Sequence, residues 1–154
     1  MAAESNERKS EKPELELVIT RVFDAPRKLV WKAWTDPESA AKWWGPKGFT
    51  LPHYEMDPRP GGAWRVCMRS PDGENHWAHG VYREITEPDR LVYTWIWEKG
   101  RQDEKLVTVT FAPQGAKTML TLHQVGFDTV QDRDDHQNGW SETLDRLAEY
   151  VTRA

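Results

Sequence analysis

The sequence predicts an α+β fold in which a curved antiparallel sheet covers one long C-terminal helix. The main observation is the segment Thr129–Arg153, where apolar residues recur at steps of three and four, as on one face of an α-helix. The second is the region 51–124, which reads as six short strands separated by turn residues. With 154 residues, the chain has the size of one domain.

The N-terminal residues are polar and charged, and we expect a disordered tail over 1–13 followed by a single domain over 14–154. The domain begins with a strand at Leu15–Phe23, whose apolar residues alternate with polar ones. Arg21 interrupts the apolar face of this strand. A buried arginine needs a carboxylate or a ligand as its partner, so Arg21 is a candidate polar group inside the domain.

Two short helices are predicted after the first strand. The first begins near Pro26, because proline is well tolerated in the first turn of a helix. The second has Asp36 as its N-cap and ends at Gly45-Pro46, where glycine and proline together stop a helix. Of the two adjacent tryptophans before this stop, we expect one to fill the core. The other is either a hydrophobic gate or an exposed docking residue.

After the two short helices, the sequence predicts six strands. They cover residues 51–56, 63–69, 75–85, 91–98, 107–111 and 120–122. Because short turns connect them, successive strands should pair as an antiparallel meander. One face of such a sheet must be covered. The C-terminal segment, about 33 Å long as a helix, is the one predicted helix long enough for this.

The C-terminal helix has a predicted start, an apolar face and one unusual residue. Thr129 and Asp132 have the spacing of a capping box. The main apolar anchors are Trp140, Leu144, Leu147 and Val151. Gly139 costs helix stability, and we expect it to allow the close approach of another backbone.

Composition excludes several classes of function. The net charge of −4 and the pI near 5.7 argue against a nucleic-acid partner. No apolar run is long enough to span a membrane. Cys67 is the only cysteine, which fits a cytoplasmic location. We predict no metal site, since the histidines lack ligand spacing, and no cofactor or catalytic motif is recognisable.

Nine tryptophans are many for one domain, and they predict an aromatic cavity between the sheet and the C-terminal helix. The expected lining residues are Trp44, Phe49, Trp64, Val66, Met68, His79, Tyr93, Trp95, Trp97, Val109, Phe111, Leu120, Leu122, Trp140 and Leu144. Arg21 and His123 are expected to add polar groups. The alternatives are that the apolar residues simply fill the core and that a strand edge or bulge turns the polar ones to solvent.

Several short motifs recur in this order in one family. They are residues 19–26 (ITRVFDAP), 30–37 (VWKAWTDP), 43–46 (WWGP), 59–62 (RPGG), 79–82 (HGVY), 88–91 (PDRL) and 139–140 (GW). Over about residues 14–153, the chain resembles the bacterial single-domain relatives of the activator of heat-shock-protein-90 ATPase. The resemblance implies the helix-grip fold shared by START lipid carriers, polyketide cyclases and birch-pollen-allergen-like proteins, with a cavity under the long helix.

Three functions remain open at this point. The first is non-enzymatic binding of a hydrophobic small molecule in the cavity. The second is a co-chaperone or protein-interaction module, as the name of the resembled family suggests. The third is a cyclase-like or hydrolase-like enzyme that uses His79 or Glu84.

Overall fold

A computed structural model describes residues 15–100 and 102–153, so the predicted tail at 1–13 lies outside the described residues. The elements in chain order are β1 (Leu17–Phe23), α2 (Arg27–Thr35), α3 (Pro37–Ala40), β2 (Thr50–Met56), β3 (Ala63–Arg69), β4 (Asn75–Thr86), β5 (Arg90–Trp97), β6 (Lys105–Gln114), β7 (Lys117–Val125) and α4 (Val130–Arg153). This order confirms the predicted succession of one strand, two short helices, six strands and one long helix.

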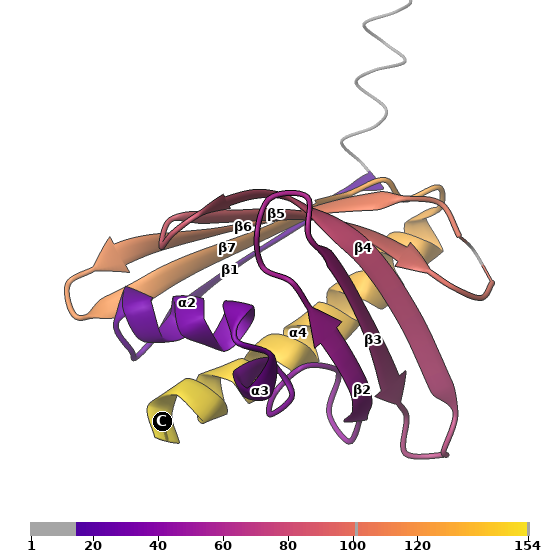
Figure 1. Ribbon diagram of the computed structural model, residues 1–154, viewed down its shortest axis with the longest axis horizontal. Helices are drawn as coiled ribbons and strands as arrows, with labels where there is room; N and C mark the ends of the chain where they lie inside the picture. The colour runs from indigo at the N-terminus through magenta and orange to yellow at the C-terminus, as the bar shows by residue number, and fades with distance from the viewer. Residues whose placement is uncertain (1–14, 101, 154) are drawn as a thin grey trace, which may run out of the picture.

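The strands form one antiparallel sheet in the order β1-β7-β6-β5-β4-β3-β2. The last six strands are a meander, and β1 joins it by pairing with β7, with Leu17 opposite Gln124 and Phe23 opposite Thr118. The sheet curves over α4, and α2 and α3 lie on the same side of the sheet as that helix (Figure 1). The predicted α+β fold class is therefore confirmed.

The helix α4 begins where its cap predicts. The hydroxyl of Thr129 accepts a hydrogen bond of 3.0 Å from the backbone N–H of Asp132. The residues that α4 buries are Trp140, Thr143, Leu144, Leu147 and Val151. Each large apolar side chain among them contributes about 1.5–3 kcal/mol when it is removed from water. Packing of this face therefore holds the helix against the sheet.

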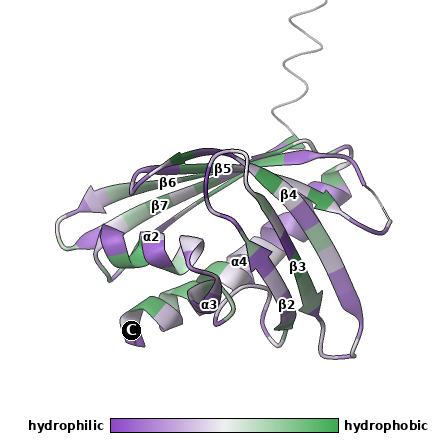
Figure 2. Cartoon of the chain, viewed as in Figure 1, coloured by the Kyte–Doolittle hydropathy of each residue, from purple (hydrophilic) through white to green (hydrophobic). Residues whose placement is uncertain are grey.

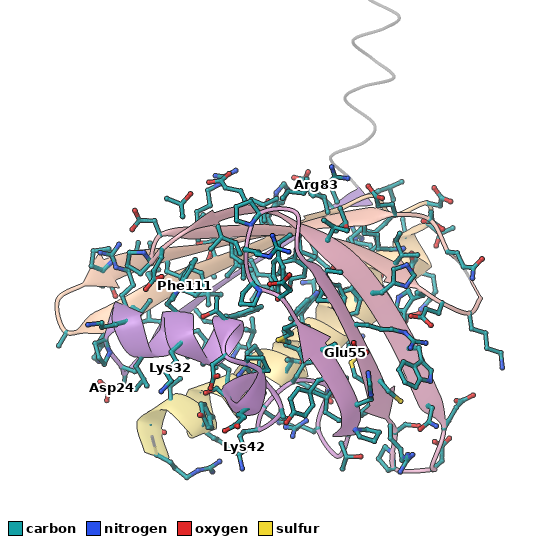
Figure 3. All side chains as sticks on the ribbon, viewed as in Figure 1. Asp24, Lys32, Lys42, Glu55, Arg83 and Phe111 are labelled. Atoms are coloured by element: carbon teal, nitrogen blue, oxygen red, sulfur yellow. The ribbon has the colours of Figure 1, made fainter. Side chains whose placement is uncertain are left out.

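Alternation along the strands separates the core from the outer surface. Hydrophobic and hydrophilic bands follow one another along the strands (Figure 2). In Figure 3, Phe111 lies between the sheet and α2, and Arg83 lies on the outer side of the sheet. The ring of Phe111 meets that of Trp31 at 5.2 Å between centroids. One end of the concave face is thus filled by α2.

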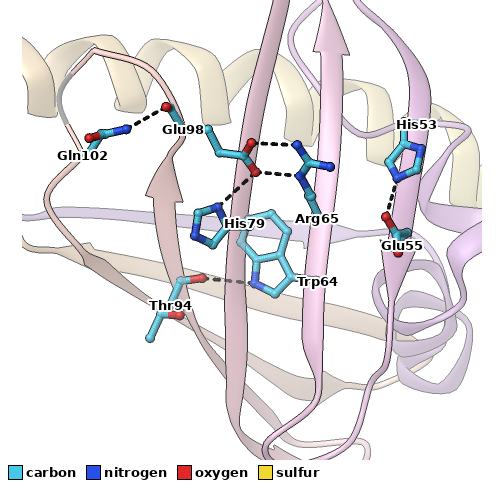
Figure 4. A network of polar contacts seen from close by, with 8 residues as sticks. All are labelled: His53, Glu55, Trp64, Arg65, His79, Thr94, Glu98 and Gln102. Carbon is cyan, nitrogen blue, oxygen red and sulfur yellow. Dashed lines mark hydrogen bonds and ion pairs between the residues drawn. The ribbon is translucent and has the colours of Figure 1, made fainter.

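Beside Gly80, side chains take part in the hydrogen bonding between β4 and β5. The indole Nε1 of Trp64 donates a hydrogen bond of 3.1 Å to the backbone carbonyl of Thr94 (Figure 4). The backbone N–H of Val81 donates to the Thr94 hydroxyl at 2.8 Å. Gly80 has no side chain to block the indole, so Trp64 can reach across β4 to β5.

Arg21 ties the edge strand β1 to α4. Its guanidinium donates to the Asp145 carboxylate at 2.8 Å and to the backbone carbonyl and hydroxyl of Ser141 at 3.1 Å each. The hydrogen bond from Arg21 lowers the pKa of Asp145. The expected placement of Arg21 inside the cavity is therefore corrected. The residue faces inward as predicted, but a helix carboxylate is its partner.

Candidate ligand-binding pocket

A pocket of about 430 Å³ opens between the N-terminal half of α4, the ends of the strands β3, β4 and β5, and the loop after α3. Its lining residues are Trp44, Gly45, Pro46, Phe49, Met68, His76, Trp95, Trp97, Asp132, Asp135, His136, Gly139, Trp140 and Thr143. The volume lies in the range that small-molecule sites usually have. No helix in the described part of the chain is long and apolar enough to cross a membrane.

Three buried indoles form the floor of the pocket. The rings of Trp44 and Trp95 are stacked, with an interplanar angle of 8° and 6.2 Å between centroids. Trp140 meets each of them edge-on at 5.9 Å. Trp97, at the end of β5, meets Trp95 edge-on at 5.3 Å and is only partly buried. The floor is therefore aromatic and closely packed, while one wall is accessible.

Arg146 holds the loop that forms one wall. Its Nη1 lies 3.0–3.3 Å from the backbone carbonyl oxygens of Trp44, Gly45, Pro46 and Phe49. Partial burial lowers the pKa of the Arg146 guanidinium. All four of these loop residues line the pocket, so one α4 side chain fixes the backbone from which this wall is built.

The adjacent tryptophans Trp43 and Trp44 have different roles. Trp43 is fully buried, and its Nε1 donates a hydrogen bond of 3.0 Å to the backbone carbonyl of Ala33. Trp44 faces the pocket. The core role expected for one of the two therefore falls to Trp43.

A hydrogen-bond network connects the wall and floor of the pocket to the sheet. The indole N–H of Trp97 donates to His136 Nε2 at 3.0 Å. A tryptophan Nε1 can only donate, so His136 Nε2 is an acceptor and the ring carries its proton on Nδ1. That Nδ1 then donates to Gln124 Oε1 at 3.2 Å, and Trp140 Nε1 donates to the same oxygen at 2.8 Å. The network requires a neutral imidazole.

Stability should therefore fall in mildly acidic solution. Burial lowers the pKa of His136 from 6.5 to about 4, although the Asp132 carboxylate opposes this shift. Between these two pH values the unfolded chain binds a proton that the folded chain does not, so folding free energy is lost as pH falls from 6.5 to about 4. Urea unfolding over this range should show a steeper pH dependence for the wild type than for His136→Gln. Equal slopes would contradict the assignment.

Two carboxylates lie at the pocket and differ in their partners. Asp132 Oδ2 lies 3.2 Å from Nζ of Lys105, whose side chain is fully buried. Asp103 lies 3.4 Å from the same nitrogen. Asp135 is exposed and accepts a hydrogen bond of 2.8 Å from the Gln131 side chain. Among residues 15–100 and 102–153, no group of His, Cys, Asp or Glu side chains is arranged to hold a metal ion.

The predicted cavity residues other than His79 divide into two groups. Those that line the pocket are Trp44, Phe49, Met68, Trp95, Trp97 and Trp140. Those that pack in the core outside it are Trp64, Val66, Tyr93, Val109, Phe111, Leu120, Leu122 and Leu144. The core group lies where the side chains of α2, α3 and α4 fill the concave face, so for these residues the structure matches the alternative of simple core packing.

The predicted polar residues His79 and His123 lie on the outer face of the sheet, which corrects their expected placement in the cavity. Figure 4 shows Glu98 between His79 and Arg65, at 3.0 and 2.8 Å. Hydrogen bonds from Arg65, then from His79, lower the pKa of Glu98 to about 2. His123 Nε2 lies 3.2 Å from Glu16. Strand periodicity explains both cases, because buried neighbours alternate with these histidines.

Several lining residues were not among those predicted. They are Gly45, Pro46, His76, Asp132, Asp135, His136, Gly139 and Thr143. Helical spacing carried a usable signal, since Asp132, His136 and Gly139 precede Thr143 at steps of four and three. The expectation for Gly139 is wrong, because its nearest neighbour is the Pro46 side chain, 3.8 Å from the position of an added Cβ, and not a backbone.

The comparisons with known proteins agree with this architecture. The protein CV1439 from Chromobacterium violaceum is 30% identical, with a TM-score of 0.84 over 89% of this chain and 96% of that one. The AHSA1 protein from Silicibacter pomeroyi is 24% identical, with a TM-score of 0.82 over 89% and 97% of the two chains, and supports the fold alone. CalU16 from Micromonospora echinospora is 26% identical, with a TM-score of 0.69 over 88% and 75%.

No curated protein matches the chain. Residues 24–152 match the family model described as Activator of Hsp90 ATPase homolog 1-like protein. This range contains both short helices, six of the seven strands and nearly all of α4. The predicted resemblance is thereby confirmed, and the chain belongs to the family of proteins like the activator of Hsp90 ATPase homolog 1.

Proposed function

We propose that this protein binds a hydrophobic small molecule with an aromatic ring in the pocket between α4 and the ends of the strands β3 to β5. The observation that carries the proposal is the floor of three buried indoles, Trp44, Trp95 and Trp140, beneath a space of about 430 Å³. Flat indole surfaces favour offset-stacked or edge-to-face contact with an aromatic ligand. The family and its fold are compatible with such a role.

The direct test is a titration with a panel of aromatic and lipid compounds. Binding should change the tryptophan fluorescence and raise the melting temperature, because a ligand that binds the folded state alone stabilises it. A ligand at 100 times its Kd should add about 2.7 kcal/mol. If no compound in a broad panel changes either signal, the proposal fails.

A leucine at position 139 should block the pocket without unfolding the protein. Gly139 lines the pocket, and leucine is a better helix former than glycine. We therefore expect Gly139→Leu to weaken ligand binding at least tenfold while the melting temperature stays the same or rises. Asn138→Leu adds the same side chain at an exposed position outside the lining and should leave binding unchanged. Equal affinities of the two variants would place the ligand elsewhere.

A second candidate is a co-chaperone, and the family match is the observation in its favour. Its test is the ATPase rate of the cognate chaperone with and without saturating protein. An unchanged rate removes this candidate. The positions of His79 and Glu84 do not favour a cyclase or hydrolase that uses them. His79 pairs with Glu98, and Glu84 pairs with Arg90. Neither residue lines the pocket.

A further inference from the structure

We propose that the ligand of this pocket is cationic, with a protonated amine attached to an aromatic body. The inference rests on the proposed function and narrows it to a class of compound. It follows from the charges at the pocket, from the indoles that line it and from the state of the nearest basic groups.

Apart from two histidines, His76 and His136, the ionisable residues that line the pocket are acidic. Asp132 and Asp135 line it, and the lining residues include no lysine or arginine within the described ranges. Lys105 already neutralises Asp132 at 3.2 Å. Asp135 is exposed, and Gln131 gives it a neutral hydrogen bond. In the described part of the chain no basic side chain pairs with Asp135, so its charge is available to a ligand.

No cation from the described residues lies over the indoles that line the pocket. Within the described residues, the cation–π pairs are Arg65 over Trp77, at 4.1 Å, and Lys105 over Phe127, at 5.6 Å. Neither ring belongs to the pocket. Indole is the ring that attracts a cation most strongly, and sites for organic ammonium ions are commonly built from several aromatic side chains. Trp44, Trp95, Trp97 and Trp140 supply such a set in the lining of the pocket.

The basic groups at and beside the pocket are neutral or already face protein oxygen atoms. His76 lines the pocket, and its Nε2 lies 3.6 Å from the Glu74 carboxylate. His136 is held neutral by the hydrogen bond that it accepts from Trp97. The Nη1 of Arg146 is surrounded by loop carbonyl oxygens. Lys105 is fully buried and faces Asp132 and Asp103. A carboxylate ligand would therefore meet Asp135 without finding a positive partner, whereas an ammonium group would find Asp135 and the indole faces.

Three naphthyl probes of similar shape test the charge of the ligand by calorimetry at pH 7 and low salt. They are naphthylmethylamine, naphthylmethanol and naphthylacetate, which are positive, neutral and negative. The amine should bind about five- to tenfold more tightly than the alcohol, as expected for one exposed ion pair together with a cation–π contact. The acetate should bind most weakly, and added salt should reduce the advantage of the amine.

Asp135→Asn should reduce the preference for the amine over the alcohol to twofold or less and leave the affinity for the alcohol unchanged. Asp24→Asn removes the same charge at an exposed position near α2, away from the pocket, and should keep the preference (Figure 3). If the alcohol binds and the amine binds no better, the inference fails while the proposed function stands. If Asp135→Asn keeps the full preference, Asp135 is not the partner and the inference also fails. If none of the probes binds, both proposals fail for aromatic ligands.

Discussion

Replacing Trp140 with alanine should lower the free energy of unfolding by about 3–5 kcal/mol, the usual cost of truncating a buried tryptophan. The side chain is 5% exposed, and its ring lies about 6 Å from those of Trp34, Trp44 and Trp95. The truncation also removes the hydrogen bond from Trp140 Nε1 to Gln124. Urea unfolding followed by circular dichroism measures the loss without relying on tryptophan fluorescence.

Trp140→Phe is the matched control, because it keeps an aromatic ring and removes the donor. We expect a smaller loss from this variant than from Trp140→Ala. Trp140 is both a core anchor and part of the pocket floor, so Trp140→Ala should also weaken ligand binding. A loss of less than 1 kcal/mol for Trp140→Ala would contradict the view that this residue anchors α4 to the indole cluster.

Gly80→Ala should destabilise the protein by about 3 kcal/mol or more, at or beyond the upper end of the usual cost of overpacking. A Cβ at position 80 would lie 1.9 Å from the backbone oxygen of Thr94 and 2.6 Å from the indole nitrogen of Trp64. The first of these atoms belongs to the neighbouring strand and cannot move without opening the sheet. The hydrogen bond between Trp64 and Thr94 would be lost as well.

Gly139→Ala is the opposite case and serves as the control. An added Cβ at position 139 would make ordinary contact, 3.8 Å from Pro46. Because alanine favours helices, this variant should gain up to about 1 kcal/mol. The same change in two glycines is thus expected to move the midpoint of urea unfolding in opposite directions. A shift of both midpoints in the same direction would show that local space does not determine these effects.

The fold could be predicted because its periodicities are strong and agree with one another. The apolar steps of three and four in α4 and the alternation along β6 and β7 each fix which side of an element is buried. The pairing of β1 with β7 was not contained in these patterns. The meander has two edge strands, β2 and β7, and β1 pairs with β7. The hydrophobic pattern of β1 shows which of its faces is buried, but not which edge strand it pairs with.

The pocket could be predicted only in part, because burial patterns do not distinguish a filled interior from a hollow one. Val109 and Trp95 both belong to the inward face, but only Trp95 lines the pocket, since the packed core fills the space over Val109. His79 shows a second limit. His79 alternates along β4 with the buried residues Ala78 and Gly80, so its side chain points to the outer face. This can be recognised only when the neighbouring residues of the strand are considered together.

The position of β1 in the sheet has a consequence for synthesis on the ribosome. Thr20 and Thr121 face each other across the pair of β1 and β7, yet they are 101 residues apart in the sequence. At about 5–20 residues per second, β1 waits roughly 5–20 s for its partner. During that time Val18 and Val22 belong to a strand with unpaired edges, which is open to association with other chains. The sheet therefore cannot be completed until β7, the partner of its first strand, has been synthesised.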